Sequence, residues 1–238
     1  MRHIGSALMS GRISDFAFYP EGNQSFITGV SSGGVFRTTN GGTTWEPLFD
    51  GEASYAIGVV EIDPNDSDTL WVGTGENNAQ RSVAAGDGVY KSVDGGKSWT
   101  NVGLNNSGHI SKIWINPADS DEVLVAAQGP LWSDGGDRGL YRTTDGGATW
   151  ESLLSIDQHT GINEFVVDPR NPDVIVASSY QRRRHVWVLI NGGPGSGIHK
   201  STDRGKTWTE ISSGLPSDHM GRIGLAGAPS DSDMIYAI

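Results

Sequence analysis

The chain has 238 residues, a formal net charge of −11 and no cysteine. The absence of cysteine excludes a disulfide framework and a thiolate metal site, and the acidic balance argues against nucleic acid as the main partner, because phosphate binding needs a basic face. No apolar run reaches the ~18 residues of a membrane span. The first five residues lack the apolar core of a signal peptide.

Strand-like segments repeat in a fixed order along the chain, beginning with an apolar stretch at residues 11–18. A proline turn, a second apolar strand and a loop follow, and the third strand begins with Gly and ends on Arg or Lys. An eight-residue turn of the pattern Ser/Thr-x-Asp/Asn-x-Gly-x-Ser/Thr-Trp then leads into a fourth strand. The opening strand recurs at residues 55–62, 108–115, 161–167 and from 221, and the turn occurs at residues 38–45, 92–99, 143–150 and 201–208.

The eight-residue turn has a structural explanation at each position. Its acidic or amide side chain is expected to accept backbone N–H groups and close the turn, and its glycine supplies a positive φ. The tryptophan is expected to bury its ring and to need a partner for its N–H. We therefore assign a structural role to Asn40, Trp45, Asp94, Trp99, Asp145, Trp150, Asp203 and Trp208, and we expect Asp145 to be a buried turn acceptor.

The spacing of the turns predicts the fold. The four tryptophans lie 54, 51 and 58 residues apart, which indicates an array of small all-β units. Four antiparallel strands in about 50 residues are typical of a β-propeller blade. We predict an all-β propeller of four-stranded antiparallel blades, with four complete blades and the start of a fifth, as a fragment of a larger ring. Its blades are expected at residues 11–50, 55–104, 108–155, 161–213 and 221–238, all within one domain, 1–238.

The repeated turn and strand order resemble the Asp-box (BNR-repeat) β-propellers over residues 11–238. That family includes sialidases, xyloglucan-degrading glycoside hydrolases, sortilin-type receptor ectodomains and a photosystem II assembly factor. The sequence pattern of the repeats is most similar to that of secreted bacterial proteins described as sortilin-like or BNR glycosyl hydrolases. The resemblance implies an extracellular or cell-surface location and further blades outside this chain. Because one propeller hosts both enzymes and binders, the fold leaves the activity open.

Two residues match the catalytic patterns of relatives in part. Sialidases of this fold carry an Arg in a Phe-Arg-Ile-Pro context. The resemblance implies that only Arg12 corresponds to this Arg. Xyloglucan hydrolases place an acidic residue in the first inner strand, where Asp15 is the nearest candidate. The second carboxylate that glycoside hydrolysis needs is left unassigned, as are the catalytic residues as a whole.

Candidate ligand-binding residues lie at the opposite end of the strands from the Asp boxes. The loops between second and third strands vary in length there, and variable loops on a rigid scaffold commonly carry binding. Arginines offer planar donors for carboxylates, while Trp132 and Trp187 offer flat faces for sugar rings. The candidates are Arg12, Glu76, Arg81, His109, Arg138, Arg182, Arg184, Trp187 and Arg222.

The sequence leaves three functions open. The favoured one is a ligand-binding module of a secreted or cell-surface bacterial protein, which binds a glycan or a protein or peptide at this face. The alternative is a glycoside hydrolase, sialidase-like or xyloglucanase-like, with catalytic residues partly outside this chain. A scaffold for assembling proteins is the third, and it requires a broad apolar patch. No cofactor, metal site, nucleic-acid partner or membrane span is predicted.

Overall fold

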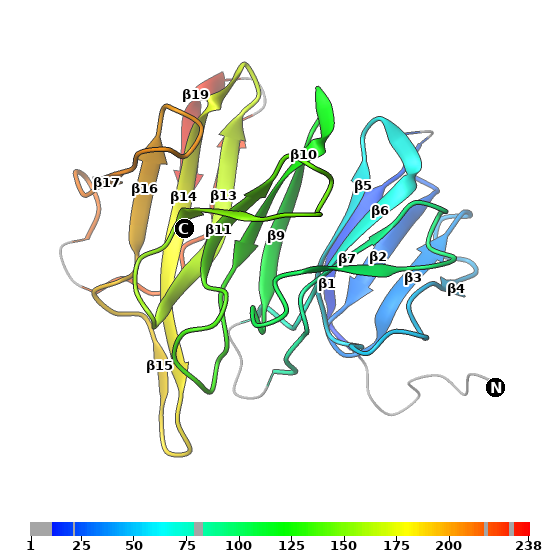
Figure 1. Ribbon diagram of the computed structural model, residues 1–238, viewed down its shortest axis with the longest axis horizontal. Helices are drawn as coiled ribbons and strands as arrows, with labels where there is room; N and C mark the ends of the chain where they lie inside the picture. Colours follow the sequence, from blue (N-terminus) through cyan, green and yellow to red (C-terminus); the bar gives the residue numbers. More distant parts are fainter. Residues whose placement is uncertain (1–10, 21, 79–82, 217–218, 229–230) are drawn as a thin grey trace.

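The computed structural model describes residues 11–20, 22–78, 83–216, 219–228 and 231–238. The described residues contain strands and no helix, and the strands form five sheets that lie side by side in chain order (Figure 1). We call these sheets blades one to five. In blades one to three each strand pairs antiparallel with the next, as the sequence predicts, and blade four keeps this order with β15 added to the side of β14. The prediction of an all-β propeller of four-stranded antiparallel blades is confirmed.

The blades have the following strands. Blade one contains β1 (Ile13–Phe18), β2 (Phe26–Val30), β3 (Gly34–Thr38) and β4 (Glu46–Pro47), and blade two contains β5 (Ile57–Asp63), β6 (Asp66–Thr74), β7 (Val89–Ser92) and β8 (Thr100–Gly103). Blade three contains β9 (Ile110–Asn116), β10 (Asp119–Ala127), β11 (Gly139–Thr143) and β12 (Glu151–Leu154). Blade four contains β13 (Thr160–Asp168), β14 (Asn171–Arg184), β15 (Leu189–Asn191), β16 (Gly197–Ser201) and β17 (Thr209–Ile211), and blade five contains β18 (Leu225–Ala228) and β19 (Asp231–Ala237).

The hydrophobic core lies between neighbouring blades. Ile27 of blade one packs in one cluster with Val60 and Leu70 of blade two, and equivalent clusters join the later blades. A strand between two neighbours therefore buries both faces, as β5 does. Strand β1 differs from the continuous burial that its apolar sequence predicts, because no described blade covers its outer face: Phe16 is 48% and Phe18 54% exposed.

The innermost strand of each of the first four blades contains one extra residue in its pairing. Strand β9 pairs Ile110 with Ala127 and Lys112 with Ala126, so that Ser111 is left over as a bulge. The hydroxyl of Ser111 donates to the carbonyl of Ile162 in blade four at 3.0 Å. The extra residues are Ser14, Gly58, Ser111 and Asn163, and the last three contact the backbone of the next blade.

The Asp boxes are closed by local hydrogen bonds. In the second box, Asp94 Oδ1 accepts the backbone N–H of Ser98 at 2.9 Å, and Asp94 Oδ2 accepts the Ser98 hydroxyl at 2.6 Å. Ser92 donates its hydroxyl to Asp94 at 2.8 Å and accepts the N–H of Gly96 at 2.9 Å. These bonds stabilise the charged carboxylate and lower the pKa of Asp94 to about 2.

Asp145 and Asp203 repeat this geometry, and their pKa values are also lowered to about 2 by the hydrogen bonds they accept. The carboxylate of Asp145 is exposed. The expectation of a buried acceptor at this position is therefore wrong: an acceptor that closes a tight turn needs only the local backbone donors, which lie at the surface here.

The box tryptophans join each blade to the one before it. In blades two to four the indole N–H donates to a backbone carbonyl of the preceding blade's outermost segment. The pairs are Trp99 to Leu48 at 2.8 Å, Trp150 to Val102 at 2.7 Å and Trp208 to Leu153 at 2.9 Å. Trp45 in blade one is 44% exposed, and no described residue accepts its N–H.

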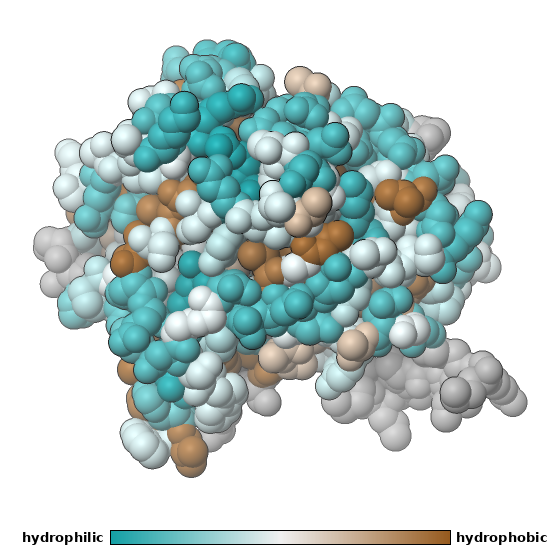
Figure 2. Space-filling view, viewed as in Figure 1, coloured by the Kyte–Doolittle hydropathy of each residue, from teal (hydrophilic) through white to brown (hydrophobic). Residues whose placement is uncertain are grey.

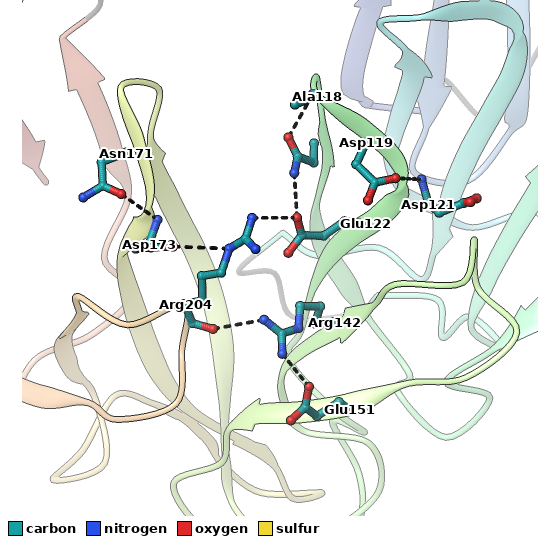
Figure 3. Close-up of polar contacts among 10 residues, drawn as sticks. Ala118, Asp119, Asp121, Glu122, Arg142, Glu151, Asn171, Asp173 and Arg204 are labelled. Carbon is teal, nitrogen blue, oxygen red and sulfur yellow. Dashed lines mark hydrogen bonds and ion pairs between the residues drawn. The ribbon is translucent and has the colours of Figure 1, made fainter.

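A second set of contacts joins the same blades. In β3, β7 and β11 the cation one residue before the end of the strand donates to the backbone carbonyl just after the Asp of the next blade's box. The pairs are Arg37 to Gly95 at 3.0 Å, Lys91 to Gly146 at 3.2 Å and Arg142 to Arg204 at 3.3 Å. In the last pair Arg142 also donates to Glu151, and Arg204 reaches Glu122 and Asp173 (Figure 3).

Blade four departs from the predicted pattern at one place. The sequence predicts a long loop from residue 181 to 196, whereas β14 continues to Arg184 and pairs with β15. The resulting hairpin projects beyond the other blades (Figure 1), and its end is apolar on an otherwise mostly hydrophilic surface (Figure 2). Val186 and Trp187 at that end are each 83% exposed.

Candidate functional site

The candidate residues converge on one end of the blades, which we call the loop face. It consists of the loops between second and third strands and the starts of the inner strands. Because β2 and β3 are antiparallel and joined at this end, the Asp box that follows β3 lies at the opposite end. The box carboxylates therefore do not reach the loop face.

Arg12 and Glu76 form an ion pair between blade one and blade two. The Glu76 side chain is 2% exposed and that of Arg12 is 44% exposed. Glu76 is thus covered, and the arginine is the member of the pair that faces solvent.

A chain of polar side chains links the loop face across four blades. Arg222 donates from Nε to Asn163 Oδ1 at 2.8 Å, and Gln128 Nε2 donates to the same oxygen at 2.8 Å. Arg182 donates to Gln128 Oε1 at 3.1 Å and to the backbone carbonyl of Asn78 at 2.7 Å. Arg182 is buried, whereas the Arg222 residue is exposed.

Sequence reasoning missed the two amides that connect these arginines. Gln128 directly follows β10, the second strand of blade three, and Asn163 is the bulged residue of β13. Both are buried polar residues, and Asn163 also donates to the carbonyl of Ile223 in blade five at 2.8 Å. The one signal in the sequence is Asn163, an amide inside an otherwise apolar inner strand.

Two further candidates are occupied by internal contacts. Arg138 is buried and donates to the carbonyls of Gly135 at 2.9 Å, Gln128 at 2.6 Å and Ser133 at 3.0 Å, and also to that of Pro130. Burial lowers its pKa to about 10. The guanidinium of Arg138 thus uses four of its five N–H groups to hold the loop of blade three in shape.

His109 is buried at the start of β9 and remains neutral near neutral pH. Burial lowers its pKa to about 3, and the charges of Arg182 and Arg138 act in the same direction. Burial and the charge of Arg222 also lower the pKa of Arg182. The positive charges at the centre of this face therefore repel one another.

Aromatic rings form a separate part of the loop face, on the projecting hairpin and the loop beside it. The Arg184 guanidinium lies 5.8 Å from the ring centroid of Trp132, which is 57% exposed. His185 stacks on Trp187 with centroids 5.6 Å apart and planes 13° apart. The backbone N–H of Arg184 donates to the carbonyl of Leu131 at 2.8 Å, so the hairpin and the loop form one wall.

The structure thus separates the described candidates into three groups, of which the Arg12–Glu76 ion pair is one. Arg138, Arg182, His109 and Arg222 gather around Gln128 and Asn163, while Arg184 and Trp187 lie on the aromatic wall. Arg81 lies outside the described residues.

Charged side chains also occur on the inner strands, below the loop face. Asp15 accepts the backbone N–H of Val60 at 3.1 Å, and burial raises its pKa. Burial, followed by the charge of Asp15, raises the pKa of Glu61 to about 7. Lys112 forms an ion pair with Glu164 at 2.6 Å. Sequence reasoning assigned Asp15 but missed Glu61, although a carboxylate in the apolar strand β5 is an available signal.

The described residues show neither a group of side chains able to hold a metal ion nor a helix long and apolar enough to cross a membrane.

Comparisons with known proteins agree with this fold. The chain is similar to a xyloglucanase from Paenibacillus sp, with 25% identity over 232 residues that cover 86% of this chain and 21% of the relative. Among solved structures, it resembles the GH74 xyloglucanase from Xanthomonas campestris with a TM-score of 0.67, at 20% identity over 94% of this chain and 35% of the other. It also resembles YCF48 bound to D1 peptide, with a TM-score of 0.54 at 16% identity over 97% of this chain and 68% of the other.

The xyloglucanases that the chain matches are much longer proteins, since it spans about a quarter of their length. A family model described as sortilin, neurotensin receptor 3 matches residues 87–237, which is more than half of the chain. The match covers three of the four Asp boxes and agrees with the resemblance seen in the sequence. The chain is an Asp-box β-propeller that belongs to the Sortilin-Vps10 family.

Proposed function

We propose that this chain is a ligand-binding propeller module of a secreted or cell-surface protein and that it binds a glycan at the loop face. The observation that carries the proposal is the aromatic wall. Trp132 has Arg184 near one face of its ring, and Trp187 has His185 stacked against one face. Both rings remain more than half exposed, which leaves surface for a sugar ring to stack.

The remaining loop-face groups supply polar recognition beside this wall. The hydrogen bond from Arg222 Nε to Asn163 restricts this side chain, so binding of a ligand oxygen by its two terminal nitrogens would cost less conformational entropy. Small-molecule sites commonly combine apolar rings with a few placed polar groups. The xyloglucanase relatives support a glycan as the ligand.

Replacing the exposed tryptophans tests this proposal. Trp132→Ala and Trp187→Ala are expected to weaken the affinity for xyloglucan oligosaccharides about tenfold each, equivalent to about 1.4 kcal/mol. Isothermal titration calorimetry measures the affinity. Trp45→Ala is the matched control, because Trp45 is also an exposed tryptophan but lies in an Asp box at the opposite end. Unchanged binding in both loop-face variants would remove the aromatic wall as the glycan site.

A glycoside hydrolase is the second candidate, and a specific observation favours it. Glu61 has a pKa raised to about 7 and lies within the electrostatic influence of Asp15 on the neighbouring blade. Glycoside hydrolysis uses one carboxyl group that stays protonated and one that is ionised. In this candidate Glu61 is the general acid and Asp15 the ionised partner.

Activity measurements separate the two functions. If the pair is catalytic, Glu61→Gln and Asp15→Asn each lower hydrolysis of xyloglucan or β-glucans at least about a hundredfold, in line with the usual effect of losing an acid or base. Glu46→Gln, at an exposed ion pair with Arg37, is the control. Glycan binding without hydrolysis by the wild-type chain favours the binding module, and hydrolysis that survives Glu61→Gln removes the acid assignment.

A further inference from the structure

Two arginines at the centre of the loop face have no acidic partner among the described residues. Arg182 donates to two neutral acceptors, the Gln128 side chain at 3.1 Å and the Asn78 backbone carbonyl at 2.7 Å. Arg222 donates from Nε to the Asn163 side chain at 2.8 Å. We call the two guanidinium groups and the side-chain amides of Gln128 and Asn163 that hold them the arginine centre.

The described arginines at the box end of the blades, in contrast, are all paired. Each of these four arginines forms an ion pair with a carboxylate, and two of the pairs are drawn in Figure 3. The pairs are Arg37–Glu46 and Arg142–Glu151 at 2.7 Å, Arg170–Asp168 at 3.3 Å and Arg204–Glu122 at 3.2 Å. The chain carries 28 acidic residues and a net charge of −11. Because carboxylates are abundant, the lack of one at the arginine centre is a local property.

The sequence around Arg182 is depleted of acidic residues. Residues 174–202 contain no Asp or Glu, although they include three arginines and a lysine. The loop-face carboxylates that form described ion pairs have other partners, since Glu76 pairs with Arg12 and Asp134 pairs with Arg183 at 3.4 Å. The positive charge of the arginine centre is therefore not neutralised by the described residues.

The buried member of the centre increases the effect of this charge. Arg182 Nε is buried and has no described acceptor. A positive charge in a poorly solvated site attracts an anion more strongly than the same charge in water does. Arg222 is exposed, and its two terminal nitrogens have no described acceptor. An anion that binds these nitrogens also reduces the repulsion between the two arginines.

The arginine centre lies next to the aromatic wall along one strand. Arg184 follows Arg182 by two residues of β14, which is a distance of about 7 Å along a strand. Both side chains reach blade three, because Arg182 donates to Gln128 and Arg184 lies beside the Trp132 ring. This distance is comparable to the spacing of neighbouring sugars, so one oligosaccharide can contact the wall and the centre together.

We propose that the loop face selects an acidic glycan and that the arginine centre binds the anionic group of one sugar, a carboxylate or a sulfate ester. The inference rests on the proposed function, because it concerns the charge of the glycan that stacks on the aromatic wall. Arg222 contacts the anion with its terminal nitrogens, whose fork suits the paired oxygens of either group. Buried Arg182 adds the second positive charge.

Three forms of one xyloglucan oligosaccharide test the proposal by isothermal titration calorimetry with the whole chain. The first form is unmodified and uncharged. In the second form the galactose C6 is oxidised to a carboxylate, and in the third form the C6 hydroxyl carries a sulfate ester. At least one charged form is expected to bind about tenfold more tightly than the uncharged form, and less so at high salt. The tighter of the two charged forms identifies the anionic group.

Substitutions at Arg222 locate the preference. Arg222→Met is expected to weaken binding of the charged form about tenfold more than that of the uncharged form. Arg222→Lys keeps the charge and is expected to retain part of the preference. Arg170→Met is the matched control, because it also removes an exposed arginine, but at the box end. It is expected to retain the whole preference.

Each contrary outcome has a distinct meaning. Equal binding of all three forms overturns the inference and leaves the proposed function intact. A preference that survives Arg222→Met, or that Arg170→Met removes to the same extent, shows general electrostatic attraction and also overturns the inference. If no form of the oligosaccharide binds, the proposed function itself is wrong. Binding of an oligoglutamate peptide in that case assigns the arginine centre to an acidic protein partner instead.

Discussion

The carboxylate of Asp145 lies in solvent, yet it accepts the backbone N–H of Thr149 at 2.9 Å and the Thr149 hydroxyl at 2.6 Å. Its folded-state pKa of about 2 lies below the ordinary value of 3.8. The charged form therefore stabilises the folded state fully above pH 3.8, and this stabilisation is lost as the pH falls through 2.

Asp145→Ala is accordingly expected to lower the melting temperature at pH 7 and to lower it less at pH 2. Circular dichroism at both pH values measures the difference. Thr144→Ala is the control, because Thr144 is an exposed neighbour in the same box. A decrease in melting temperature that is the same at pH 2 and pH 7 contradicts the role of the charged carboxylate.

Glu61 has the opposite linkage. Its folded-state pKa of about 7 lies above the ordinary value of 4.5, so its contribution to stability is present below pH 4.5 and is lost as the pH rises through 7. Glu61→Gln is expected to raise the free energy of unfolding relative to wild type at pH 8 and to change it little at pH 4. Urea unfolding at both pH values provides the test.

The free energy of unfolding of the Glu61→Gln variant must be compared with that of the wild type at each pH, because the pKa shift of His109 also makes stability depend on pH. Its pKa falls from 6.5 to about 3 on folding, so its contribution to stability grows as the pH rises from 3 to 6.5. This contribution is common to both proteins and cancels in the difference. A difference that does not grow with pH means that Glu61 is ionised in the folded protein at neutral pH.

At the scale of single residues, the sequence identifies candidate residues by their type but does not predict which contacts their side chains make. The sequence singles out Arg182, Arg222 and Trp187 as candidate ligand-binding residues from their residue types, and their loop positions follow from the repeat. The internal use of Arg138 depends on four backbone carbonyls of a loop without repeat partners. Such a conformation is set by tertiary contacts, which residue patterns do not encode.

At the scale of the strands and turns, the box tryptophans connect one blade to the next. Trp150→Phe keeps the aromatic ring but removes the hydrogen bond to the Val102 carbonyl. It is expected to lower the free energy of unfolding by about 1 kcal/mol, the usual net value of such a bond.

Trp45→Phe is the matched control for this prediction, because no described residue accepts the Trp45 N–H. It is expected to leave the free energy of unfolding nearly unchanged. Chemical denaturation followed by circular dichroism measures both variants. Equal effects of the two substitutions show that the interblade hydrogen bond contributes no stability.

The strands themselves were largely predictable, because Gly, Pro and the boxes mark their ends. The extension of β14 to Arg184 was not predictable in the same way. Three consecutive arginines and a histidine predict a loop. In the structure, Arg182 pairs with Asn191 and Arg184 with Leu189, and this pairing extends the strand. Cross-strand pairing and contact with the loop at Leu131 outweigh the local preference there.

At the scale of the whole molecule, the blades approach so closely at the inner strands that side chains are excluded. A Cβ at Gly58 lies 2.0 Å from the Ile110 carbonyl oxygen of the next blade. Gly58→Ala is expected to push blades two and three apart and to lower the free energy of unfolding by about 1–3 kcal/mol.

Gly51→Ala is the control for this substitution, since a Cβ there meets no atom within 4 Å. Differential scanning calorimetry of both variants provides the measurement. An unchanged melting temperature in Gly58→Ala contradicts the close packing of these two blades.

The period of about 50 residues predicts this architecture because each blade repeats the same contacts with its neighbour. Stability in such an array is approximately a sum over blades and interfaces. The burial of the first blade departs from the pattern for the same reason. Phe16 and Phe18 are apolar as the repeat requires, but their exposure depends on which blade lies beside them.

The two kinds of interblade hydrogen bond give the array a direction. In the three interfaces between blades one and four, the box tryptophan donates backward along the chain and the third-strand cation donates forward. Each of these interfaces is therefore head-to-tail: the earlier blade supplies the cation and one carbonyl, and the later blade supplies the indole and the box carbonyl. Two copies of the same blade face, brought together by a two-fold axis, would match neither donor with its acceptor.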